Sequence, residues 1–115
     1  MPAYNFQKQF APAVKSGEKH QTIRAKRKNR PRVGQMAYCF TGMRTKKCRL
    51  LKKARIRGVY DVRIDGCGVL INGAAIVHNE LDLFALRDGF HCWAAILLWF
   101  ERIHGLPFRG DLILW

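Results

Sequence analysis

Lys19, Thr22 and Arg24 lie within six residues of one another in the segment SGEKHQTIR. An arginine can bind a phosphate or the edge of a base through its forked guanidinium. A threonine hydroxyl can donate, accept or attack, and a lysine is a point charge, or a base when it is removed from water. The spacing therefore indicates a site for a phosphate or a polar base. The competing interpretation, which spacing alone favours, is that Thr22 suits a strand and the two cations are surface charges.

A hydroxyl that attacks a substrate needs a partner that takes its proton. Residues 1–60 contain a single acid, Glu18, so a carboxylate working beside Lys19 has to come from the second half of the chain. Asp88 is the candidate, because it lies in the segment RDGF between two predicted helices, where a side chain can point into a cleft. It suits the N-cap of the following helix equally well. The predicted catalytic group is therefore Lys19, Thr22 and Asp88.

The 115-residue chain carries a net charge of +13 at pH 7, and this charge is unevenly distributed. Residues 1–60 hold 17 of the 21 lysines and arginines, whereas residues 61–115 hold four of them and seven acids. A positive charge of this density attracts polyanions, and nucleic acid is the first candidate among them. The excess of basic over acidic residues is also larger than solubility requires. The predicted nucleic-acid-binding side chains are Arg24, Lys26, Arg27, Lys28, Arg30, Arg32, Arg44, Lys46 and Lys47.

Hydrophobic periodicity predicts a small α+β protein. Strands are expected over residues 3–7, 20–24, 35–41, 48–53, 55–65, 69–77 and 111–115, and helices over residues 10–16, 83–87 and 89–104. We expect Gly17 to end the first helix with a positive φ, Asp82 to cap the second, and the third to pack on a sheet through a wide apolar stripe. Residues 24–32 cannot enter a core and are expected to form an exposed, mobile loop. The order of elements predicts one domain, a mostly antiparallel β-barrel with helices packed outside it.

Other classes of function find little support in the composition. The longest apolar run, residues 92–100, is far shorter than the ~20 residues of a membrane span, and we expect no signal peptide. The four cysteines lack CxxC spacing and the four histidines supply no paired ligands. We therefore expect no metal centre, no cofactor and free thiols in a reducing cytoplasm.

The chain resembles the ASCH superfamily, whose fold is a PUA-like β-barrel. The resemblance is carried by SGEKHQTIR at residues 16–24, where a helix ends at glycine and is followed by a charged residue, a lysine and then T-I-R. Supporting segments are TGMRTKKCR at residues 41–49, FALRDGF at residues 84–90, and a tail with GLPF before a last strand that ends in tryptophan. These segments span nearly the whole chain, so the resemblance implies one ASCH domain over residues 1–115.

The resemblance implies a cleft beside the motif that binds RNA or nucleotides. Some small bacterial members deacetylate 4-acetylcytidine with a lysine, a threonine and a glutamate, which would correspond to Lys19, Thr22 and, one methylene shorter, Asp88. The motif arginine corresponds to Arg24, and at least one member is similar to a ribonuclease in activity. The basic stretch at residues 24–32 is heavier than a free-nucleoside enzyme needs. We therefore expect an RNA- or nucleotide-binding domain, with an amidohydrolase and a metal-independent ribonuclease as the alternatives.

Overall fold

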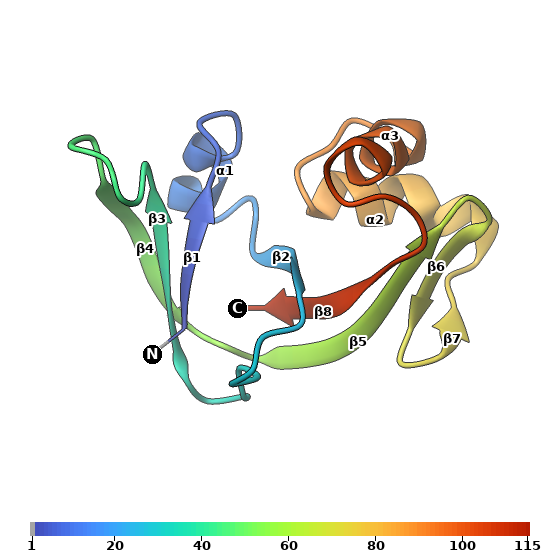
Figure 1. Cartoon of the computed structure of the whole chain (residues 1–115), viewed down its shortest axis with the longest axis horizontal. Helices are drawn as coiled ribbons and strands as arrows, with labels where there is room; N and C mark the ends of the chain where they lie inside the picture. Colours follow the sequence, from blue (N-terminus) through green and yellow to red (C-terminus); the bar gives the residue numbers. More distant parts are fainter. Residues whose placement is uncertain (1) are drawn as a thin grey trace.

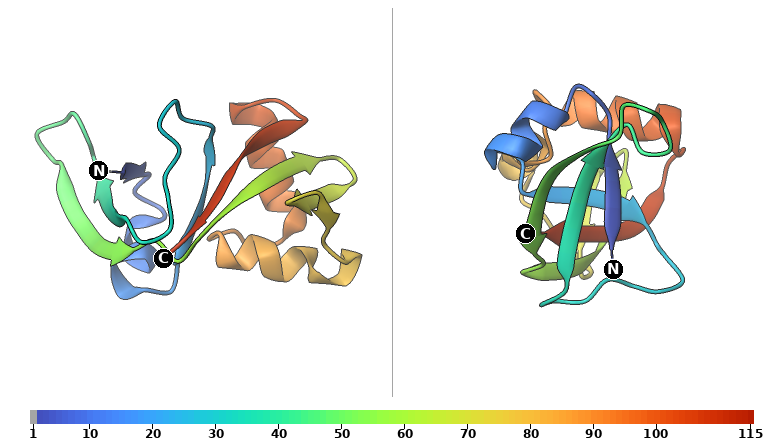
Figure 2. Two further views of the ribbon diagram at one scale, coloured as in Figure 1. Left: turned by 90° about the horizontal axis from the view of Figure 1, so that it is seen from below. Right: turned by 90° about the vertical axis from the view of Figure 1, so that its left-hand side faces the viewer.

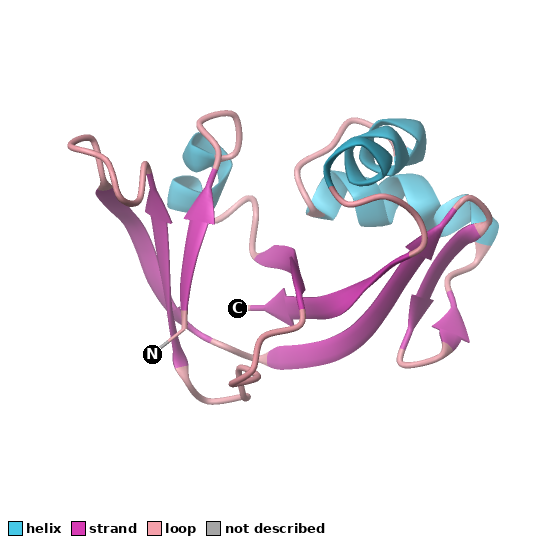
Figure 3. Cartoon of the chain, in the orientation of Figure 1, coloured by secondary structure: helices cyan, strands magenta, loops and turns pink. Residues whose placement is uncertain are grey.

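The computed structural model describes residues 2–115, which form two β-sheets and a set of short helices (Figures 1 and 3). One sheet has the strand order β1-β3-β4, and the other has the order β2-β8-β5-β6-β7. The strands are β1 (Ala3–Phe6), β2 (Gln21–Ala25), β3 (Met36–Thr41), β4 (Arg49–Arg55), β5 (Gly58–Asp65), β6 (Gly68–Ile71), β7 (Ala74–Ala75) and β8 (Phe108–Leu114). The helices are α1 (Ala11–Ser16), η1 (His78–Glu80), α2 (Leu81–Arg87) and α3 (Trp93–Ile103).

The three-stranded sheet packs its apolar side chains against α1 and the C-terminal residue. Strand β1 pairs with β3 in parallel, whereas β3 and β4 are antiparallel and their register shifts between Cys39 and Phe40. The core of this half contains Tyr4, Val14 and Trp115 among its buried residues. Because β3 covers one edge of β1, the other edge of β1 is left open toward the second sheet.

The five-stranded sheet is antiparallel and has β8 between β2 and β5. Helices α2 and α3 lie together over this sheet (Figures 1 and 2), and Phe84 and Ile96 bury their side chains against it beside Ile64 and Leu112. The apolar stripe of α3 is the reason for this placement, because a helix that is apolar over much of its surface has to pack against another element. No helix within residues 2–115 is long and apolar enough to span a membrane.

The predicted α+β class, the mostly antiparallel strands, the short first helix and the helix pair in the second half are confirmed. The strand predicted over residues 55–65 is wrong in its extent, because β4 ends at Arg55 and β5 begins at Gly58. Ile56, between them, is buried in the core of the first sheet, whereas Ile64 is buried in the core of the second. The chain therefore crosses between the two sheets where the alternation suggested one uniform strand. The strands form two separate sheets, and the PUA-like barrel stays a prediction.

Two predicted helix starts are wrong for related reasons. Helix α3 begins at Trp93, not near residue 89, and Asp82 lies inside α2 and does not cap it. The Oδ1 of Asp82 instead accepts a hydrogen bond of 2.8 Å from the backbone N–H of Trp93. One of the free N–H groups at the start of α3 is thereby satisfied by a neighbouring helix. The last strand also starts earlier than predicted, at Phe108.

The basic loop after β2 is exposed as predicted, but acids of the second half of the chain anchor it. Lys26 and Arg30 donate to the buried carboxylate of Asp111, over 2.6 Å and 3.1 Å, and both also contact Asp61. Arg27 donates to the backbone carbonyl of Ala3 over 2.9 Å. Part of the positive charge that the sequence assigns to a free loop is therefore already neutralised within the fold.

Candidate functional site

A cavity of about 250 Å³ opens where the free edge of β1 faces β2, beside α3. Its polar lining includes Lys19, Thr22, Arg24 and Asp88, so the structure brings together the residues that the sequence singled out. Its apolar lining includes the rings of Phe6, Phe10, Phe90, Trp99 and Phe100. We call this cavity the cleft. It combines hydrogen-bonding groups with aromatic walls, as sites for small ligands commonly do.

Lys19 enters the cleft because of the turn that ends α1. Gly17 adopts φ +90°, as predicted, and its N–H bonds the carbonyl of Val14 while the N–H of Lys19 bonds that of Ala13. This turn directs Lys19 inward, and only 4% of the residue is exposed. Its Nζ donates to the backbone carbonyl of Asp88 over 2.7 Å and lies 3.4 Å from Asp88 Oδ1. The interpretation of Lys19 as a surface charge is therefore wrong.

Asp88 follows the end of α2, is 5% exposed and faces the cleft. It is not the N-cap of α3, because Cys92 holds that position and Asp82 supplies the bond to Trp93. Its Oδ1 also accepts a hydrogen bond of 3.2 Å from Gln21 Nε2. The sequence analysis did not single out Gln21, because its partner Asp88 is 67 residues away and a single glutamine in a strand is not part of any recognisable motif.

Burial dominates the protonation behaviour of the Lys19–Asp88 pair. Loss of hydration lowers the pKa of Lys19, and the charge of Asp88 offsets only part of this effect. Loss of hydration likewise raises the pKa of Asp88 against the opposing influence of Lys19 and Gln21. Both groups are therefore shifted toward their neutral forms, which makes a proton easier to move between them and a bound ligand.

Arg24 joins the two sheets and holds Thr22. Its Nε donates to Thr22 Oγ1 over 2.9 Å, and its terminal nitrogen donates to the backbone carbonyl of Asn5 on β1 over 2.8 Å. Its guanidinium carbon lies 4.8 Å from the centre of the Phe6 ring, within the range of a cation–π contact. Thr22 and Arg24 share one face of β2, as the period of a strand requires. The same period would place His20 on this face, but His20 precedes β2 and is not among the residues that line the cleft.

The other predicted nucleic-acid-binding residues lie outside the cleft. Lys28 and Arg32 are exposed beside the three anchored cations of the basic loop. Arg44, Lys46 and Lys47 are exposed on the turn between β3 and β4. The structure therefore separates these predicted nucleic-acid-binding residues into two regions, one before β3 and one after it.

No metal centre is apparent in the part of the chain that the structure describes, and the buried cysteine, Cys39, is not a reactive thiol. No group of three or more His, Cys, Asp or Glu residues within residues 2–115 is arranged to hold a metal ion. The four cysteines are free, and burial raises the pKa of the Cys39 thiol to about 11. A thiol with this pKa stays protonated at neutral pH and is a poor nucleophile.

Comparison with known proteins adds no relative. No protein-family model, no curated protein and no solved structure matches this chain. The function is therefore argued from the residues and their geometry.

The raised pKa of Asp88 predicts a pH dependence of stability. Its carboxyl binds a proton more tightly in the folded protein than in the unfolded chain, whose pKa is near 3.8. Above pH 3.8 and up to the higher folded pKa, the native state holds more protons, so the free energy of unfolding decreases as the pH rises through this window. Urea unfolding of wild type and Asp88→Asn across this range is the measurement. The variant should lack this decrease, and parallel pH profiles would contradict the assignment.

Proposed function

We propose that this chain binds single-stranded RNA or a nucleotide, with a base in the cleft, as an ASCH-type domain with a PUA-like fold. The observation that carries the proposal is the cleft itself, which sets the buried ammonium of Lys19 and the half-buried guanidinium of Arg24 among aromatic rings. The motif SGEKHQTIR, whose lysine, threonine and arginine all line this cavity, supports the family assignment. An unpaired base presents a polar edge and an aromatic face, and the cleft offers partners for both.

The aromatic wall suits stacking. Phe10 and Phe90 are in edge contact with ring centres 5.4 Å apart, and Phe90 contacts Trp99 in the same way at 5.8 Å. Stacking of a base on an aromatic side chain contributes about 1–3 kcal/mol and tolerates any base. Preference among bases would come from the polar groups, above all Lys19, Arg24 and the hydroxyl of Thr22.

A salt titration tests RNA binding. We expect the affinity for a fluorescent single-stranded oligonucleotide to decrease as salt rises, with a logarithmic slope of about −0.7 for each phosphate contact. Arg24→Gln should weaken binding, because it removes a positive charge from the cleft together with the hydrogen bonds of the guanidinium to Thr22 and Asn5. Arg102→Gln, a change of the same charge at an exposed position on α3, is the matched control. Affinity that hardly changes with salt, or equal binding by the two variants, would contradict the proposal.

A second candidate function is amide hydrolysis of 4-acetylcytidine, and the Lys19–Asp88 contact is the observation that favours it. A lysine with a lowered pKa can act as a base, and a carboxylate beside it can hold it in position. Thr22 Oγ1 accepts its hydrogen bond from Arg24, which leaves the hydroxyl proton free for a base. Attack by this oxygen on the acetamide carbonyl would expel cytidine, whose amino group takes a proton from the base, and would leave an acetyl ester on Thr22 that water then hydrolyses to acetate. Direct attack by an activated water would instead give acetate and cytidine without the ester, and in both cases Arg24 would hold the nucleoside.

Incubation with 4-acetylcytidine decides this second function. Release of acetate by the wild type, lost in Lys19→Met and retained in Arg102→Gln, is the result the hydrolase requires. If the wild type releases no acetate while RNA binding persists, the cleft is a binding site alone.

A further inference from the structure

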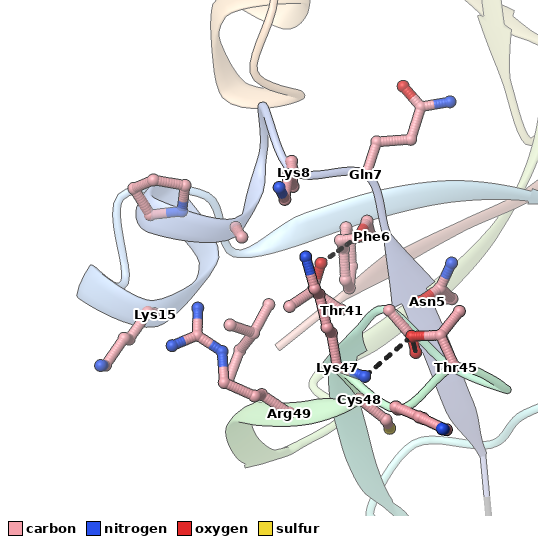
Figure 4. Close-up of a pocket in the computed structure, with 15 residues that line it drawn as sticks. Asn5, Phe6, Gln7, Lys8, Lys15, Thr41, Thr45, Lys47, Cys48 and Arg49 are labelled. Carbon is pink, nitrogen blue, oxygen red and sulfur yellow. Dashed lines mark hydrogen bonds between the residues drawn. The ribbon is translucent and has the colours of Figure 1, made fainter.

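A second and larger pocket, of about 950 Å³, borders the end of β1 (Figure 4). We call it the basic groove. It is bounded by α1, by the turn between β3 and β4, and by the start of β4. Figure 4 shows Lys8, Lys47 and Arg49, which come from three different segments, around one opening. Lys15 and Lys46 bring the number of lysines and arginines in its lining to five.

The charge of the basic groove is available to a ligand. No aspartate or glutamate is among the residues that line it. Within residues 2–115, none of its five cations is in an ion pair. The basic loop differs, because Lys26 and Arg30 are held by Asp61 and Asp111. The fold therefore leaves the positive charge of the groove free. It neutralises part of the charge of the basic loop, which is the segment of the sequence richest in lysine and arginine.

The basic groove and the cleft are adjacent. Asn5, Phe6 and Gln7, at the end of β1, line both. A chain-like ligand can therefore occupy the cleft and continue past Gln7, which is exposed, into the groove. The groove also has apolar lining, from Pro12 and Leu51, against which sugars and bases can rest while the cations contact phosphates.

We propose that the basic groove is the path of the RNA backbone next to the cleft, with Lys47 and Arg49 as phosphate-binding residues. This inference rests on the proposed function and adds to it the route of the strand. The cleft binds one nucleotide, and the groove supplies the additional affinity for an oligonucleotide. Cations that contact phosphates contribute affinity without sequence preference, and each contact releases counterions.

The test compares two double variants that lose the same charge. Lys47→Gln/Arg49→Gln removes two cations of the groove, and Lys53→Gln/Arg57→Gln removes two exposed cations that do not line it. Binding of an oligonucleotide of about eight residues, within the site sizes of small single-strand-binding folds, is measured against salt, together with binding of cytidine monophosphate. Thermal unfolding verifies that both variants fold, as expected for exposed side chains.

We expect the groove variant to bind the oligonucleotide more weakly, with a salt slope smaller by about 0.7 for each of the two contacts. Its binding of cytidine monophosphate should equal that of the wild type. Equal oligonucleotide binding by the two double variants would overturn the groove as the strand path and leave the proposed function standing. A wild type that binds neither ligand would overturn the proposed function and this inference with it.

Discussion

Asp88→Ala is expected to lower the free energy of unfolding by about 3–5 kcal/mol, because it leaves the buried ammonium of Lys19 without its carboxylate. The two groups are 3.4 Å apart and both are almost fully buried, so the ammonium that remains is poorly hydrated. A small domain is stable by only about 5–15 kcal/mol, so this single change removes a large share of the total. Urea unfolding followed by tryptophan fluorescence measures it.

Two further variants make this result interpretable. Glu101→Ala removes an acid from an exposed position on α3 and should change stability by no more than about 0.5 kcal/mol. Lys19→Met/Asp88→Asn removes both charges of the pair and should recover most of the stability, whereas ligand binding should be lost because Lys19 lines the cleft. If Asp88→Ala and Glu101→Ala are equally stable, the buried pair does not hold the site together.

Gly110→Ala is expected to destabilise the protein by about 3 kcal/mol, at the upper end of the cost of overpacking, and to weaken ligand binding. An added Cβ at Gly110 would clash with the backbone carbonyl oxygen of Arg24 and would lie 2.8 Å from the ring of Phe108. The obstacle at Arg24 is backbone, so relief requires β2 to move away from β8. Because Arg24 is part of the displaced strand, its hydrogen bond to Asn5 on β1 should be weakened as well.

The matched control for this change is Gly66→Ala, where an added Cβ meets nothing within 4 Å and the backbone has no positive φ. We expect Gly66→Ala to leave stability and binding unchanged. Thermal unfolding and oligonucleotide binding of the two variants are compared directly. If Gly110→Ala has the stability and binding of the wild type, β2 and β8 are not packed closely enough at this position to exclude a methyl group.

The local features of the site were predictable from the sequence. Gly17 at the end of a short apolar helix indicated the positive φ that turns the chain, and the structure has it. The i, i+2 spacing of Thr22 and Arg24 placed them on one face of a strand, and both line the cleft. These features depend on backbone sterics and on contacts between neighbouring residues, which a short stretch of sequence determines by itself.

The partners of these residues were decided by the tertiary structure. Lys19 bonds a residue 69 positions away, and Gln21 acquires its role only because Asp88 arrives beside it. Asp111 binds Lys26 and Arg30 across 85 and 81 positions, so part of the charge of the densest basic run is neutralised, whereas the cations of the groove around Lys47 have no acidic partner within residues 2–115. Burial and charge pairing depend on which segments the two sheets bring together. A local sequence pattern carries no information about contacts between residues that are so far apart in the chain.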